Sequence, residues 1–188
     1  MGKYVPAIIA GAVVTVVLGF LLGMIGFQGF AAWYIPVFGG LITGYLMANL
    51  QGTKSGPAAS DEQRVAALAL RPSPGKALII AHRQGFVGKM AGMQVSLDGQ
   101  PIVQLKSPQF TAVEVEPGAH TIEFGFVGLA AAQNKPERVN VTLVDGEVVA
   151  YLATVSMGTG KNTIKVIRDE PIDMVPDTLR NVRMVASA

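Results

Sequence analysis

The chain has 188 residues and a formal net charge of +2; 50% of the residues are hydrophobic and only 15% are charged. An ordinary soluble domain has about 25% charged residues, so this composition is too apolar for one. The basic residues are scattered and no aromatic side chains are interleaved with them, which argues against nucleic-acid binding. The sequence contains no cysteine, which excludes disulfides, thiolate nucleophiles and cysteine-ligated metals.

The apolar surplus lies in the first fifty residues. Between Lys3 and Lys54 there is no Asp, Glu, Lys, Arg or His, and the hydrocarbon core of a bilayer accepts about 20 such residues per helical crossing. We therefore predict a transmembrane helical hairpin over residues 1–51, with helices at 4–27 and 31–50. The first apolar run is longer than the core of a signal peptide, which is about 7 to 15 residues, so we do not expect cleavage.

Small residues recur every four positions in both predicted helices, which places them along one face of each helix. They are Gly11, Thr15, Gly19 and Gly23 in the first helix and Gly40, Gly44 and Ala48 in the second. Small residues let transmembrane helices approach closely where lipid provides no hydrophobic drive for association. The two faces are expected either to pack against each other or to form a docking face for a larger membrane protein.

The basic residues next to the predicted spans indicate an orientation. Lys3 precedes the first span, and Lys54, Arg64 and Arg71 follow the second, whereas the joint between the spans carries no charge. Basic residues are in excess on the cytoplasmic side of membrane proteins. We therefore expect a multi-pass protein of the bacterial inner (cytoplasmic) membrane, with both termini and the following domain in the cytoplasm.

Residues 52–75 have the composition of a linker. Ser60 and Gln63 have the spacing of a capping box, which predicts a short helix over 61–70. The apolar residues of this helix recur at helical spacing and would lie against the membrane or the following domain. These residues are Val65, Leu68 and Ala69.

From residue 76 the apolar pattern alternates with a period of two, and Asp-Gly and Pro-Gly turn signals separate the runs. Eight strands are expected, at 77–82, 93–97, 102–105, 111–115, 121–126, 138–143, 148–156 and 163–168. Many short strands without intervening helices predict an antiparallel, Ig-like β-sandwich over residues 76–170. The tail at 171–188 includes a weak helical segment at 178–186.

Three segments of this region resemble PEGA-type domains, small bacterial envelope β-sandwiches likened to carbohydrate-binding modules. They are residues 77–83, an opening strand that ends in Arg83, residues 95–99 with an Asp-Gly hairpin, and residues 116–122 with a Pro-Gly turn into a strand. The resemblance implies a membrane-anchored all-β protein that acts as a non-enzymatic interaction or scaffold module. Such domains frequently face the periplasm, whereas the charges here predict the cytoplasm.

The sequence contains no pattern typical of catalysis or of metal binding. The glycine-rich segment at 156–163 has Val155 where a phosphate-binding loop needs its first glycine, so a hairpin turn is expected there. His82 and His120 are the only histidines, whereas a zinc site usually takes three or four ligands. We expect no cofactor, no metal and no enzymatic activity.

Two connections between strands have the composition of a contact surface. Residues 84–93 combine glycines with soft apolar side chains, and residues 127–132 are unusually apolar for a solvated connection. The candidate partner contacts are Phe86, Val87, Met90, Met93, Val127 and Leu129. These side chains could equally pack back under the sandwich as a satellite cluster.

Together these features predict a non-enzymatic accessory or structural subunit. Its hairpin would dock into a larger integral-membrane complex, whether respiratory, transport or photosynthetic, and its sandwich would brace that complex. The expected partners are the lipid bilayer and the membrane protein complex, and nucleic acid is not among them. The alternative is a membrane-tethered module that binds a glycan, a lipid headgroup or a peptide.

Overall fold

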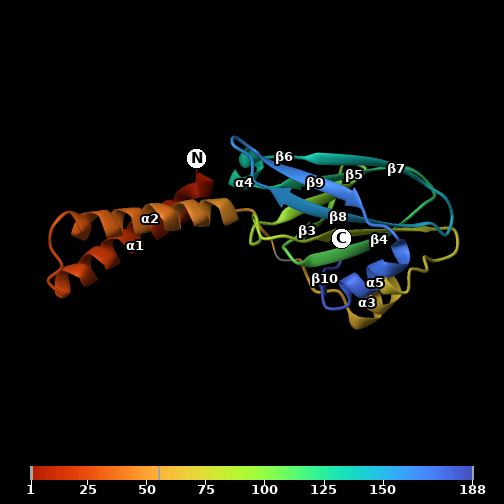
Figure 1. The fold of residues 1–188 in the computed structure, drawn as a ribbon, viewed down its shortest axis with the longest axis horizontal. Helices are drawn as coiled ribbons and strands as arrows, with labels where there is room; N and C mark the ends of the chain where they lie inside the picture. Colours follow the sequence, from red (N-terminus) through yellow and green to blue (C-terminus); the bar gives the residue numbers. More distant parts are fainter. Residues whose placement is uncertain (1, 55, 188) are drawn as a thin grey trace. The chain divides into compact units, whose positions relative to one another are not determined.

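The computed structural model describes residues 2–54 and 56–187. The chain divides into two compact units, Met1–Gln51 and Gly52–Ala188. The first unit is helical and the second is β-rich with two sheets (Figure 1). The expectation of two apolar helices followed by a β-rich region is therefore confirmed.

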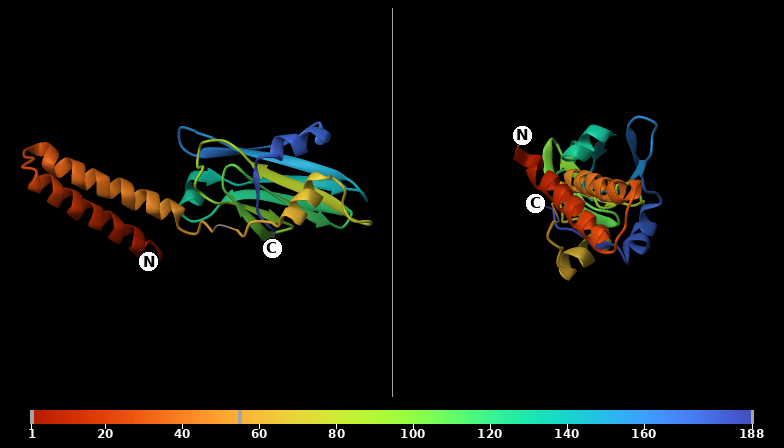
Figure 2. Two further views of the ribbon diagram at one scale, coloured as in Figure 1. Left: turned by 90° about the horizontal axis from the view of Figure 1, so that it is seen from below. Right: turned by 90° about the vertical axis from the view of Figure 1, so that its left-hand side faces the viewer.

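The first unit is a hairpin of two helices, α1 (Val5–Met24) and α2 (Phe30–Leu50), preceded by the 3-10 helix η1 (Gly2–Tyr4). The two long helices lie side by side along their length (Figure 2). With 20 and 21 residues, both are long and apolar enough to cross a membrane. A signal sequence near an N-terminus also meets this criterion of length and composition.

The helices of the hairpin bury small residues against each other and expose large ones. The buried residues are Ala7 and Gly11 in α1, and Pro36 and Gly40 in α2. The large apolar side chains point outward; examples are Ile8, Val16, Phe20, Phe30 and Trp33. The outside of the hairpin is therefore an apolar surface.

The second unit is a sandwich of two sheets. The larger sheet consists of β1 (Ala77–Arg83), β4 (Gln109–Val115), β6 (Asn134–Lys135), β8 (Val148–Ser156), β9 (Asn162–Arg168) and β10 (Arg183–Met184), in the order β10-β4-β1-β8-β9-β6. The smaller sheet consists of β2 (Met93–Leu97), β3 (Gln100–Leu105), β5 (Gly118–Phe126) and β7 (Glu137–Leu143), in the order β3-β2-β5-β7. A short helix, α4 (Leu129–Gln133), lies between β5 and β6.

The strand directions depart from the antiparallel arrangement expected from the sequence. The central strand β1 is antiparallel to β4 but parallel to β8, and the short strands β10 and β6 are parallel to β4 and β9. Between β1 and β8 the chain crosses to the smaller sheet and returns three times, through β2 and β3, through β5 and through β7. A period of two in the sequence specifies which face of a strand is buried, but it does not specify the neighbouring strand or its direction.

The main core lies between the sheets, where the inward residues of each strand meet. Ile79 of β1, Val95 of β2, Phe124 of β5 and Tyr151 of β8 all belong to it. A second apolar cluster covers the other face of the larger sheet. It joins Leu78, Ile80 and Phe110 of the sheet to Ala67, Val175 and Leu179. Strand β1 is thus buried on both faces.

The linker helix and the C-terminal tail cover this outer face together (Figure 1). Helix α3 (Asp61–Leu68) begins with the expected capping box, in which the backbone N–H of Gln63 donates to Ser60 Oγ at 3.1 Å. Ala67, rather than Val65, is its buried residue, and Val65 is exposed. The apolar periodicity of the helix allows either residue to be buried. The face that contacts the larger sheet is the one that carries Ala67.

The tail differs from the helical segment expected at 178–186. It contains the 3-10 helix η2 (Ile172–Met174), helix α5 (Val175–Leu179) and the strand β10. The strand forms because the edge of β4 offers unpaired backbone groups, and the backbone N–H of Val185 donates to Phe110 O at 2.8 Å. A weak helical propensity is overridden by this pairing.

Candidate functional site

The closest approach within the hairpin occurs at three of the predicted small residues. A Cβ atom added at Gly11 would lie 2.7 Å from the carbonyl oxygen of Gly40, and one at Gly44 would lie 3.3 Å from that of Ala7. A Cβ at Gly40 would collide with the Thr15 side chain and with Gly11 O. Glycine is therefore required where the two backbones meet.

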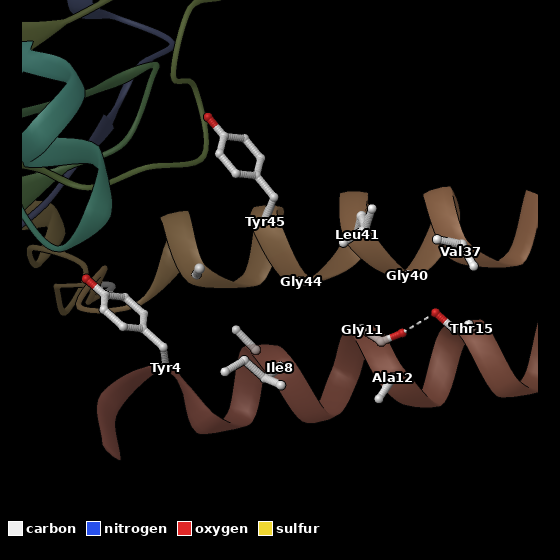
Figure 3. A pocket seen from close by; sticks show the side chains of 12 residues that line it. Tyr4, Ile8, Gly11, Ala12, Thr15, Val37, Gly40, Leu41, Gly44 and Tyr45 are labelled. Atoms are coloured by element: carbon white, nitrogen blue, oxygen red, sulfur yellow. Dashed lines mark hydrogen bonds between the residues drawn. The ribbon is translucent and has the colours of Figure 1, made fainter. Parts of the chain in front are cut away.

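The hydroxyl groups next to this contact are satisfied within their own helices. Thr15 Oγ1 donates to Gly11 O at 3.0 Å, as the dashed line in Figure 3 shows, and Thr43 Oγ1 donates to Gly39 O at 2.8 Å. Such back-bonding satisfies polar groups on a helix without water. The contact between the helices can therefore exist in an apolar surrounding.

The remaining small residues are not part of this close contact. A Cβ at Gly19 would lie 3.8 Å from Pro36, an ordinary van der Waals distance, and one at Gly23 would meet no atom within 4 Å. Ala48 lines an open hollow rather than the close contact. The structure thus brings Gly11, Thr15, Gly40 and Gly44 together and leaves Gly19, Gly23 and Ala48 beside open space.

Two hollows lie between the helices. The first, shown in Figure 3, has a volume of about 430 Å³ and includes Tyr4, Ile8, Leu41 and Tyr45 in its lining. The second has a volume of about 630 Å³ and is lined by Gly19, Gly23, Phe27, Trp33 and other residues near the turn. Both contain Thr15 and Val37. They therefore form one groove along the hairpin, which we call the hairpin groove.

The two candidate contact loops of the sandwich lie at the same end. Met93, which follows the first loop, pairs with Phe126, which precedes the second. Phe86 and Met90 are 88% and 61% exposed, whereas Val87, Val127 and Leu129 are partly buried. The structure brings these five residues to one end.

Met93 is the exception among the candidate contacts. It is the first residue of β2, and its side chain points between the sheets, where it is completely buried. A composition rich in glycine and methionine does not show where the loop ends and the inward alternation of a strand begins. Met93 is a core residue and is not available to a partner.

Arg83 organises the loop at residues 84–92. It occupies the inward position after Ile79 and Ala81 on β1 and is 0% exposed. Its Nη1 donates to Ala91 O at 2.5 Å and to Leu105 O at 2.9 Å, and its Nη2 donates to Gly88 O at 2.6 Å. Its guanidinium group lies 4.9 Å from the centre of the Phe126 ring. One side chain thus connects β1 to the loop, to β3 through Leu105 and to β5 through Phe126.

The charge of Arg83 is solvated by carbonyl dipoles and an aromatic face instead of a carboxylate. Burial lowers the pKa of this guanidinium to about 10, which leaves it protonated at neutral pH. Its Nε has no hydrogen-bond partner among the described residues. The sequence contained one signal for this role: a charged residue at an inward position of an alternating strand.

The two histidines are held in separate places, since β1 and β5 belong to different sheets. His82 Nε2 donates to Asp169 Oδ2 at 2.9 Å, and burial lowers the pKa of this imidazole despite the carboxylate beside it. His120 Nδ1 donates to Asp98 Oδ2 at 2.8 Å and its Nε2 to Glu116 O at 2.8 Å. The hydrogen bond to Asp98 is the main cause that raises the pKa of His120.

Neither histidine belongs to a metal centre in the part of the chain that the structure describes. Within residues 2–54 and 56–187, no three His, Asp or Glu side chains are grouped so that they could hold a metal ion. The glycine-rich segment that resembled a phosphate-binding loop connects β8 to β9 as a hairpin. Three features remain as candidate functional surfaces: the hairpin groove, the loop end of the sandwich and a hollow on the smaller sheet.

No protein-family model and no curated protein matches this chain. Among solved structures, the N-terminal domain of AlgF from P. aeruginosa aligns over 52% of this chain and 98% of its own, with 17% identity and a TM-score of 0.33. A protein from Eubacterium rectale aligns over 52% of this chain and 93% of its own, with 9% identity and a TM-score of 0.35. These low scores carry no argument about function, and the resemblance to PEGA-type domains is not confirmed.

Proposed function

We propose that the chain is a membrane-anchored, non-enzymatic accessory subunit whose hairpin docks against a helix of a larger integral-membrane complex. The observation that carries this proposal is the hairpin groove, which runs beside Gly19 and Gly23 where α1 and α2 leave space. Small residues next to open space allow a third helix to approach closely, and van der Waals packing drives association in lipid.

The outer surface of the hairpin supports the membrane location. Large apolar side chains face outward from both helices, and the described residues of the two spans include no charged side chain. Exposing one such side chain to water instead of an apolar medium costs about 1.5–3 kcal/mol. The proposed location is the bacterial inner membrane with the sandwich in the cytoplasm, because basic residues flank the spans. Reporter fusions after Ala188 that are active only in the periplasm would contradict this orientation.

The docking proposal is tested by extraction in mild detergent, followed by native gel electrophoresis and mass spectrometry. A stoichiometric complex with a multi-pass protein is expected. Gly23→Leu adds a side chain whose Cβ meets no atom within 4 Å in the hairpin, so it should fill the groove and release the partner while the hairpin still forms. Val13→Leu is the matched control, because Val13 is exposed and does not line the groove. A wild-type chain that migrates as a lone monomer or small homo-oligomer would contradict the proposal.

A hollow on the smaller sheet favours a second candidate function, a tethered binding module. It has a volume of about 590 Å³ and is lined by Ser96, Asp98, Gly99, Thr121, Glu123 and Arg138. These hydroxyl and charged groups suit a polar ligand such as a glycan or a peptide. Binding of the detergent-solubilised chain to glycan or peptide arrays, abolished by Thr121→Trp, would support this function. The absence of binding on such arrays would count against it.

A further inference from the structure

Five segments meet at the end of the sandwich where the chain enters it, and we call this surface the entry end. They are residues 52–54, 84–92, 106–108, 127–135 and 157–161. Strand register places them together, since Met93 pairs with both Leu105 and Phe126, and Asn134 pairs with Asn162. Arg83 joins the two sheets at this end through its bonds to Ala91 and Leu105. Figure 1 shows α4 and the connection between β8 and β9 at one end, opposite the connection between β7 and β8.

The entry end is basic. Its five segments contain five lysines and no Asp or Glu: Lys54, Lys89, Lys106, Lys135 and Lys161. The turns of the opposite end carry six carboxylates: Asp98, Glu116, Asp145, Glu147, Asp169 and Glu170. Lys54, Lys89, Lys135 and Lys161 are exposed, and Lys106 is partly exposed. The charges of the sandwich are therefore separated along its length.

Exposed apolar side chains lie in the same segments as these lysines. Phe86 is 88% exposed, Met157 is 79% exposed, and Met90, four residues after Phe86, is 61% exposed. The loop that carries Phe86 is held by Arg83, and Ser107 Oγ donates to Gly85 O at 2.7 Å. The exposure of Phe86 is thus a feature of an anchored loop. Lysines around exposed aromatic and methionine side chains are the composition of a surface that enters the interface of an anionic membrane.

The covalent chain limits how far this end can be from the hairpin. Helix α2 ends at Leu50, and Gln51 is the single residue before the second unit begins at Gly52. The first residues of the unit are fixed to the entry end, where the backbone N–H of Gly92 donates to Thr53 Oγ1 at 3.0 Å and that of Lys54 donates to Gln104 Oε1 at 2.7 Å. One residue spans at most about 3.6 Å. A hairpin that crosses a bilayer would therefore keep residues 52–54 close to the membrane surface.

We propose that the entry end is a peripheral membrane contact that binds anionic phospholipid headgroups through its lysines and inserts Phe86, Met90 and Met157 among them. The inference rests on the proposed membrane anchoring of the hairpin. It adds a second contact with the bilayer, made by the sandwich. Lysine suits this role because it is a flexible point charge that can follow a fluid layer of phosphates. Each lysine near an anionic surface strengthens binding by about fivefold.

The absence of cysteine makes the test direct, since one introduced cysteine gives one labelled site. Met157→Cys reports on the entry end, and Val144→Cys, also exposed but in the opposite turn, is the matched control. Each full-length variant is labelled with a nitrobenzoxadiazole fluorophore and reconstituted in vesicles of phosphatidylcholine alone or of equal parts phosphatidylcholine and phosphatidylglycerol. Doxyl-labelled lipids then quench whichever probe lies within the bilayer interface.

The expected result is a blue-shifted and quenched probe at position 157 in the anionic vesicles, with little change at position 144. The triple substitution Lys89→Gln, Lys135→Gln and Lys161→Gln should weaken the binding of the entry end to the anionic vesicles by about a hundredfold. The control triple Lys76→Gln, Lys165→Gln and Arg168→Gln removes the same charge from outside the entry end. It should leave the binding of the entry end to the vesicles unchanged.

Three outcomes would overturn the inference. They are a water-exposed probe at position 157 in anionic vesicles, equal quenching at positions 157 and 144, and shielding that requires a co-purified protein. Flotation of the vesicles after alkaline carbonate treatment separates this result from the anchoring proposal. A chain that floats while its probe at position 157 stays in water retains its hairpin anchor and lacks the proposed contact. A chain that does not float contradicts the anchoring itself.

Discussion

The hairpin and the sandwich distribute the same kinds of side chain in opposite ways. In the hairpin, Gly11 and Gly40 meet at the centre while residues such as Phe20 and Trp33 point outward. In the sandwich, residues such as Phe110 and Phe124 are completely buried. The hairpin therefore exposes its large apolar side chains, whereas the sandwich buries them.

Under the membrane anchoring that we propose, this difference reflects the medium that surrounds each unit. Within lipid, an outward-facing Phe costs nothing, and helix association depends on the close fit of small residues. Within water, the same Phe is stabilised by burial against other apolar side chains. The predictions below compare positions from the two units, beginning with the largest expected effect.

Arg83→Met should destabilise the sandwich most, because it removes the donor shared by the buried carbonyl groups of Ala91 and Leu105 and the partly buried one of Gly88. Each buried carbonyl left without a partner costs about 1–3 kcal/mol, so we expect a loss of at least about 2 kcal/mol in the free energy of unfolding. Urea unfolding of the full chain in mild detergent, followed by circular dichroism, measures this loss. Arg83→Lys should not restore stability, since a single ammonium cannot reproduce the fork of a guanidinium.

Arg138→Met is the control for this experiment. Arg138 is exposed on β7 and forms an ion pair with Glu123 on the outer face of the smaller sheet. Such surface pairs contribute little, and the change should be within about 0.5 kcal/mol. Equal losses at Arg83 and Arg138 would show that Arg83 does not organise the loop.

Gly11→Ala should disturb the hairpin without affecting the sandwich. The new Cβ would lie 2.7 Å from Gly40 O, a backbone atom that cannot move aside alone. The helices must separate, at a cost of about 1–3 kcal/mol. The measurement is the distance between spin labels at Val13→Cys and Leu46→Cys, which should lengthen or broaden. Gly19→Ala places its Cβ 3.8 Å from Pro36 and should leave the distance unchanged.

His82 should make the sandwich less stable in acid. Burial is the main cause that lowers its pKa, so the folded state binds its proton less well than the unfolded state. The contribution to stability is present above the unfolded pKa of about 6.5 and is lost as the pH falls from there through the lowered folded value. The urea midpoint should decline on acidification, and His82→Asn should make that slope shallower. A steeper slope in the variant would contradict the burial argument.

His120 should act in the opposite direction, with a smaller effect because Asp98 is half exposed. Its pKa is raised, chiefly by the hydrogen bond to Asp98, and that of Asp98 is lowered, chiefly by the backbone N–H of Thr121. The contribution of His120 is present below about pH 6.5 and is lost as the pH rises through its raised pKa. That of Asp98 is present above about pH 3.9 and is lost below its lowered pKa.

Asp98→Asn tests this pair. Asparagine tolerates the left-handed conformation of position 98, where φ is 50°, so the turn should survive. The variant should lose under about 1 kcal/mol, with the largest loss between about pH 4 and pH 6.5, where both groups are charged, and a smaller loss as the pH rises through the raised pKa of His120. Asp145→Asn changes the other Asp-Gly turn and is the matched control for the pH dependence of the urea midpoint.

Local patterns in the sequence were sufficient to predict part of the residues that line the candidate sites. The four-residue spacing of Gly11 and Thr15 indicated a helix face, and the glycine-rich and apolar loops indicated a contact end. The patterns did not separate Gly11 from Gly23, because helical spacing is the same for a residue in contact and a residue beside a groove. Nor did they identify Met93 as a core residue or Arg83 as the organiser of the loop.

The sequence by itself determined the two apolar helices, the capped linker helix and the alternating strands, because helix length, capping and the period of a strand depend on residues near one another in the chain. Only the tertiary structure decided the parallel pairing of β1 with β8, the strand in the tail and the meeting of five lysines at one end. These features depend on contacts between segments that are distant in sequence. Free energy gained by burial and hydrogen bonding across such distances outweighs local preference.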